Sequence, residues 1–137
     1  MSALTEARNT PEIAAGGVHY TRELTVAGGS TVYAGAITAV NSSGYAIPAT
    51  STGNITVVGR AENTASGGET VKTRSGMFVY KPVSSGAVTL NDVNKPCYVQ
   101  DDQTVTLTGG TTAVLAGIVR DVTSEGVVAE IGNGPLS

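Results

Sequence analysis

The sequence predicts an all-β protein: a small compact domain, barrel-like or sandwich-like, of short antiparallel strands with an extended N-terminal arm. Three observations lead to this fold class. Valine and threonine alternate along the chain, and glycine, serine or asparagine interrupts them about every ten residues. No stretch keeps a helical period over the roughly ten or more residues that an independent helix requires. The length of 137 residues fits one domain.

Each expected strand is a run of β-branched or aromatic residues that ends at a turn signal. In chain order the strands are Val18–Val26, Thr31–Val40, Tyr45–Pro48, Ile55–Ala61, Glu69–Arg74, Met77–Lys81, Pro96–Gln100, Thr104–Thr108, Ala113–Asp121 and Gly126–Ile131. Glycine supplies the positive φ of tight turns, and the turns are marked by Gly28-Gly29, Ser43-Gly44, Gly67-Gly68, Gly109-Gly110 and Glu125-Gly126. Asp101-Asp102-Gln103 is the expected tip of a hairpin.

The first 17 residues differ from the rest of the chain, because they contain no valine and no aromatic residue. We therefore expect an N-terminal arm over residues 1–17 and a single β domain over residues 18–137. Thr10-Pro11-Glu12 has the pattern of an N-cap followed by proline at the first helical position, which predicts a turn or two of helix within the arm. Two interpretations stay open: a frayed terminus, or an arm that becomes ordered on a partner.

A weak internal repeat links the two halves of the chain. Val57–Ala61, a turn at Gly67-Gly68 and a return strand resemble Leu115–Val119, a turn at Gly126 and a return strand. The pattern predicts two related hairpins inside one barrel or sandwich.

The charge balance argues against nucleic acid and membranes as partners. Eight Lys and Arg against eleven Asp and Glu give a net charge of −3, without a basic cluster for phosphates. No run approaches the roughly eighteen apolar residues of a membrane helix. Glu6, Arg8 and Glu12 fall where a signal peptide needs an apolar stretch. We therefore expect a soluble protein made in a cytoplasm.

The residues that could carry catalysis are few. His19 is the single imidazole, so it would have to be the base of any serine or cysteine hydrolase, and Cys97 is the single thiol. A non-catalytic role is favoured for each: we expect His19 to be a strand-surface or interface residue and Cys97 to be a small buried hydrophobic residue. Adjacent carboxylates at Asp101-Asp102 point to opposite faces of a strand, which favours a polar turn over a metal site. We expect no catalytic residues, no metal and no cofactor.

The second half of the chain resembles a known family. Asp92–Leu107 (DVNKPCYVQDDQTVTL), followed by Ala116–Val122 and Gly126–Ile131, is similar to the head decoration, or capsid cement, proteins of tailed bacteriophages. Gly35–Pro48 fits the first half of the same family, and the resemblance covers roughly Ala27–Gly132. This chain departs from the family pattern in two places. Asn94 replaces an expected glycine, and Cys97 replaces an expected aliphatic residue.

The resemblance implies a β-barrel-like structural protein, commonly a homotrimer, that is made in the host bacterial cytoplasm and binds the outer surface of the virion head. Its partner would be a major capsid protein of the HK97-type fold, whose neighbouring subunits it would bridge, and no cofactor or nucleic acid is implied. In this family the N-terminal segment often reaches onto the shell. By position, the candidate capsid contacts are Leu4, Arg8, Ile13, His19, Tyr20 and Arg22. A phage tail or fibre subunit, or an adhesin-like β binding module, is the alternative.

Overall fold

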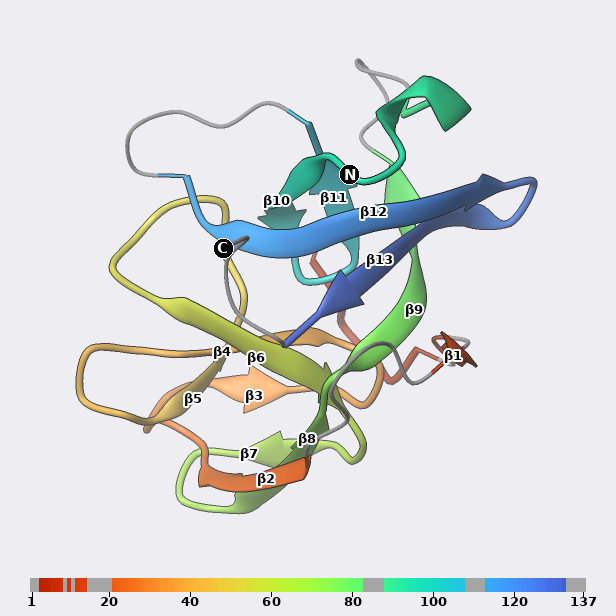
Figure 1. Cartoon of the computed structure of the whole chain (residues 1–137). Helices are drawn as coiled ribbons and strands as arrows, with labels where there is room; N and C mark the ends of the chain where they lie inside the picture. The colour runs from red at the N-terminus through yellow and green to blue at the C-terminus, as the bar shows by residue number, and fades with distance from the viewer. Residues whose placement is uncertain are drawn as a thin grey trace.

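The regular structure of the described residues is almost all β-strand, which confirms the predicted fold class (Figure 1). The computed structural model describes residues 3–8, 10, 12–14, 21–82, 88–107 and 113–132. Its elements are β1 (Glu12–Ala14), β2 (Thr21–Thr25), β3 (Thr31–Val32), β4 (Ile37–Val40), β5 (Ala46–Pro48), β6 (Thr56–Ala61), β7 (Ala65–Ser66), β8 (Thr70–Arg74), β9 (Gly76–Pro82), the 3-10 turn η1 (Leu90–Asp92), β10 (Pro96–Asp101), β11 (Thr104–Thr106), β12 (Leu115–Thr123) and β13 (Gly126–Ile131).

The second half of the chain forms a closed barrel of five strands, β9 to β13, which we call the C-terminal barrel. Its strand order is β9-β11-β10-β12-β13, and pairing between β13 and β9 closes the ring. All neighbours are antiparallel except β9 and β11, which pair in parallel. The short strand β1 adds to β9 from outside the ring.

The first half forms a curled sheet of five strands in the order β2-β8-β6-β4-β5, which we call the N-terminal sheet. Val26, which follows β2, makes a parallel bridge to Ala46 of β5, and the N–H of Ala27 donates to the carbonyl of Ala46 (2.9 Å). The two ends of this sheet are therefore joined as well. The pair β3 and β7 lies beside it as a separate two-stranded sheet.

The two halves are copies of one topology. The strands β2, β4, β5, β6 and β8 take the places that β9, β10, β11, β12 and β13 take in the barrel. Each unit contains one parallel contact at the same place, β9 with β11 in the barrel and Val26 with Ala46 in the N-terminal sheet. The structure contains the two hairpins that the sequence repeat predicted, and the similarity extends to complete five-stranded units.

The residue register shows the same correspondence. In the N-terminal sheet Thr38 lies opposite Gly59, and in the barrel Cys97 lies opposite Gly117, with the register shifting directly after each pair. Both glycines allow a neighbouring backbone to approach closely, since a Cβ at Gly59 or Gly117 would collide with the carbonyl of the adjacent return strand.

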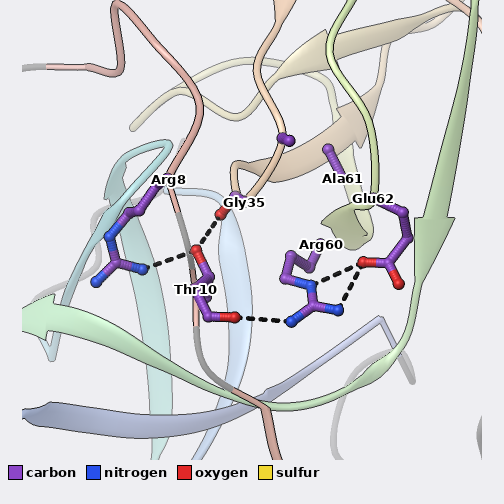
Figure 2. Close-up of a pocket in the computed structure, with 7 residues that line it drawn as sticks. Arg8, Thr10, Gly35, Arg60, Ala61 and Glu62 are labelled. Atoms are coloured by element: carbon purple, nitrogen blue, oxygen red, sulfur yellow. Dashed lines mark hydrogen bonds and ion pairs between the residues drawn. The ribbon is translucent and has the colours of Figure 1, made fainter.

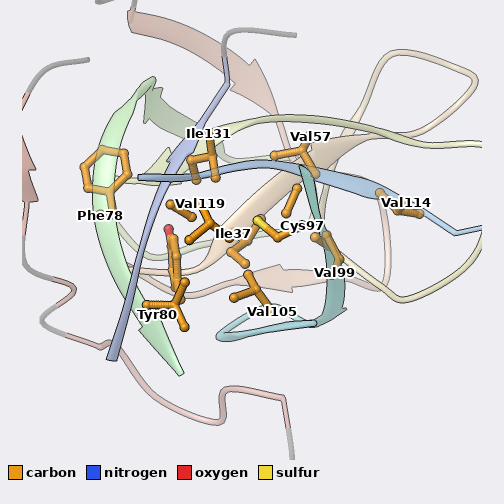
Figure 3. Packing of buried hydrophobic residues seen from close by; sticks show 14 of the residues in the cluster. Ile37, Val57, Phe78, Tyr80, Cys97, Val99, Val105, Val114, Val119 and Ile131 are labelled. Carbon is orange, nitrogen blue, oxygen red and sulfur yellow. The ribbon is translucent and has the colours of Figure 1, made fainter. Parts of the chain in front are cut away.

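The main core contains side chains from both units. Phe78 and Tyr80 of β9 pack in the same cluster as Ile37 and Val57 of the N-terminal sheet (Figure 3). A second, smaller cluster is shared by the N-terminal sheet, the β3–β7 pair and residues next to them, and consists of Val26, Val32, Ala36, Ala46, Ala61, Ala65 and Val71.

Several boundaries differ from the sequence predictions. The predicted strand Thr31–Val40 is two strands, because Gly35 adopts a left-handed φ of 92° between them. The predicted helical turn at Thr10-Pro11-Glu12 was wrong, since Glu12 begins strand β1. The hairpin tip at Asp101-Asp102-Gln103 is confirmed, with β10 and β11 on either side. The two-residue strand β7 and η1 were not predicted.

Candidate functional site

The first residues of the chain lie along the β domain as an extended segment, which we call the N-terminal strap (residues 3–8, 10 and 12–14). The N–H of Arg8 donates to the carbonyl of Ala34 (2.6 Å). The carbonyl of Arg8 lies against the Cα of Gly35, where a Cβ would overlap it. Gly35 thus serves two purposes: it turns the chain between β3 and β4, and it leaves room for the strap.

Leu4 fixes the strap to both units. Its N–H donates to Oδ1 of Asp102 (2.8 Å), at the tip of the β10–β11 hairpin. Its side chain packs against the core cluster of the N-terminal sheet. Asp102 is only 1% exposed; this burial raises the pKa of its carboxyl, and the hydrogen bond from Leu4 partly offsets the rise.

Arg8 bridges the strap to β9. Its Nη1 donates to Oγ1 of Thr10 (2.8 Å) and to the carbonyl of Val79 (2.9 Å). The guanidinium lies 5.5 Å from the centre of the Tyr80 ring, within range of a cation–π contact. Partial burial lowers the pKa of Arg8, but an arginine remains charged at any physiological pH.

A polar pocket of about 240 Å³ lies where the strap meets the N-terminal sheet, and Arg8, Thr10, Arg60 and Glu62 are among the residues that line it (Figure 2). Arg60 connects two of these residues: its Nη1 donates to the carbonyl of Thr10 (2.7 Å), and its Nε donates to Glu62 (2.8 Å). The hydroxyl of Thr10 donates to the carbonyl of Gly35 (2.7 Å). The Arg60 guanidinium also stacks 4.3 Å from the centre of the Phe78 ring. These contacts fasten the strap, and the lining residues include no nucleophile paired with a base.

The structure holds the described part of the arm against the β domain. Leu4 and Arg8, which were predicted as capsid contacts, are both half-buried and hydrogen-bonded within the chain, and their contact with a capsid stays a prediction. Arg22 is half-buried on β2 and makes intramolecular interactions. Ile13 lies in β1, but its side chain is outside the part of the structure that is described. His19 and Tyr20 lie outside the described residues altogether. Hydrogen bonds and strand pairing join the described arm residues to the β domain.

Cys97 is fully buried, as predicted for a small hydrophobe. Burial raises the pKa of its thiol to about 12, and a hydrogen bond from the backbone of Gly117 partly offsets this. Because the thiolate is the reactive form, we expect Cys97 to resist iodoacetamide at mildly alkaline pH in the folded protein and to react fully in concentrated guanidinium chloride. Mass spectrometry of the alkylated protein measures this. Rapid modification of the native chain would contradict the burial of Cys97 and would favour the hypothesis that Cys97 is the nucleophile of a hydrolase.

The remaining chemistry of the described residues is sparse. Within them, no group of three or more His, Cys, Asp or Glu side chains is arranged to hold a metal ion. The part of the chain that the structure describes also contains no helix with the length and apolar character needed to cross a membrane.

Comparison with known proteins adds no relative: no protein-family model, no curated protein and no solved structure matches this chain.

Proposed function

We propose that this chain is a structural virion protein that binds the outer surface of an assembled phage head and bridges neighbouring major capsid protein subunits. The observation that carries the proposal is where the family resemblance falls. Asp92–Leu107, Ala116–Val122 and Gly126–Ile131 coincide with β10 to β13, which make up four of the five strands of the C-terminal barrel. The three segments of the resemblance thus fall on neighbouring strands of one folding unit.

The two departures from the family pattern are compatible with the proposal. Asn94 replaces an expected glycine and has a φ of 71°, the left-handed conformation that asparagine tolerates better than most residues. Its counterpart in the N-terminal sheet is Gly35, also left-handed: the N–H of Gly35 donates to the carbonyl of Ala61, and that of Asn94 to Val119. Cys97 occupies the buried position expected of an aliphatic side chain.

The proposed mechanism is multivalent attachment. Only 14% of the residues are charged, so an interface on this surface requires little desolvation of charge. In a homotrimer, once one subunit is attached, the other two contacts are intramolecular, which raises apparent affinity by about 10² to 10⁴. Because the protein binds the assembled lattice and not free subunits, each occupied site stabilises the shell by roughly 2.7 kcal/mol at a hundredfold excess over Kd.

Sedimentation with phage heads tests the proposal. Purified protein should pellet with mature heads that lack it, stay in solution without them, and show a trimer or a monomer–trimer equilibrium by light scattering. Decorated heads should withstand heating or chelators better than bare heads. Failure to pellet with the heads would overturn the proposal. Rings or tubes of the protein alone in negative-stain images would instead favour a tail or fibre subunit.

A further inference from the structure

The pocket between the strap and the N-terminal sheet has more positive than negative charge. Among its described lining residues the charged ones are Arg8, Arg60 and Glu62. Nε and Nη2 of Arg60 both contact Oε2 of Glu62 (2.8 and 2.7 Å), so the charges of these two residues compensate each other. The charge that is left over in this lining is therefore that of Arg8.

Arg8 has no acidic partner within the part of the chain that the structure describes. Its two hydrogen bonds both start from Nη1, and their acceptors, the hydroxyl of Thr10 and the carbonyl of Val79, are uncharged. Its Nε and Nη2 donate to no described residue, and they lie on the side of the guanidinium that faces away from Thr10 (Figure 2). Two adjacent N–H donors of this kind match the two oxygens of a carboxylate or phosphate group.

The surroundings of Arg8 make an uncompensated charge costly. The side chain is half-buried over the ring of Tyr80, and burial lowers the pKa of Arg8. Burial also raises the pKa of Tyr80, so the phenol is neutral at physiological pH and supplies no negative charge. Arg60 adds repulsion, because both guanidinium groups are hydrogen-bonded to Thr10. A bound anion would relieve both the repulsion and the cost of burying an unpaired charge.

We propose that this pocket binds an oxyanion, a carboxylate or phosphate group, through the Nε and Nη2 groups of Arg8. The pocket volume of about 240 Å³ is several times the roughly 30 Å³ that a water molecule takes up in the liquid, which leaves room for a phosphate ion. The oxyanion is either a free ion or the carboxylate of an acidic side chain on another protein chain. Binding requires no capsid and is therefore independent of the proposed function.

The test is a titration of the full-length chain with inorganic phosphate at constant ionic strength, followed by proton–nitrogen NMR. The Nε–H signal of Arg8 and the amide signals of Gly35 and Glu62 should shift and saturate, with a Kd on the order of 1 mM for two charge-assisted hydrogen bonds. N-acetylaspartate amide, titrated in the same way, stands in for an acidic side chain. Tighter binding of phosphate would identify a free ion as the ligand, and tighter binding of the aspartate compound would identify a side chain. Without saturable shifts from either probe, the inference is wrong.

Two substitutions should change the phosphate affinity in opposite directions. Arg8→Gln removes the charge and should weaken binding about tenfold or more. Glu62→Gln removes the carboxylate that compensates Arg60 and should strengthen binding severalfold, which a purely structural role of Arg8 does not predict. Lys81→Gln is the matched control, because it removes an exposed positive charge outside the pocket lining and should bind as the wild type does.

The wild-type titration and Glu62→Gln give readouts that do not depend on Arg8→Gln folding. Unchanged affinity in a folded Arg8→Gln, or weaker binding by Glu62→Gln, would overturn the inference. An equal loss in Arg8→Gln and Lys81→Gln would also overturn it, because it would indicate general attraction of anions rather than a site at Arg8. None of these results bears on whether the protein pellets with phage heads.

Discussion

Deleting residues 2–14 will lower the free energy of unfolding by about 5 kcal/mol, at about 1 kcal/mol for each of the five hydrogen bonds described above that join the strap to the rest of the chain. The sequence alone predicted nearly no effect, because an arm that orders on a partner contributes nothing to the isolated domain. In the structure the deletion leaves the carbonyls of Gly35 and Val79 and the carboxyl of Asp102 without their partners. Chemical denaturation of the purified variant measures the loss.

A single substitution can disturb the strap's contact with the β domain without shortening the chain. Gly35→Ala places a methyl group against the backbone of Arg8 and strains a left-handed φ, so it should lower stability by a large part of the deletion's effect. In the truncated protein the clash with Arg8 is absent, and only the cost of the left-handed φ should remain. Glu6→Ala is the control, since Glu6 is an exposed strap residue. If the truncated protein unfolds at the same denaturant concentration as the full chain, the strap does not contribute to stability.

The second large effect is expected at Gly117. A Cβ at this position would collide with the carbonyl of Glu130 on the paired strand β13. Neither backbone can shift without disturbing the barrel, so Gly117→Ala should cost about 3 kcal/mol. Thermal unfolding followed by circular dichroism would report it.

Gly28→Ala is the matched control, because nothing lies within 4 Å of a Cβ built at Gly28. This variant should unfold close to the wild-type temperature. Equal stability of the two variants would show that the close approach of β12 and β13 at Gly117 is not required.

The strands were predictable where local pattern decides the structure. The alternating run at β8 has one buried and one exposed face, which the sequence shows directly, whereas the valine-rich run at β13 is buried at nearly every position. Strand β1 was missed because Glu12–Ala14 becomes a strand only by pairing with β9. The break at Gly35 was missed because it depends on the strap crossing there, a contact between residues far apart in the chain.

The candidate site was less predictable than the fold. No local signal connects Arg60 with Thr10 or Leu4 with Asp102, because those partners lie 50 and 98 residues apart in sequence. The internal repeat was visible only at β6–β8 and β12–β13. The strands β2 and β9 have the same place in their units but bury different side chains: Leu24 is half-buried, whereas Phe78 and Tyr80 are fully buried.

A protein built from two similar units could in principle assemble without limit. If each half offered the same bare strand to the next molecule, copies could add end to end into a filament, because such a contact does not close on itself. The strap occupies that strand in the second half by means of β1 and Arg8. One terminus thereby covers, in the second half, a strand that the repeat alone would leave uncovered.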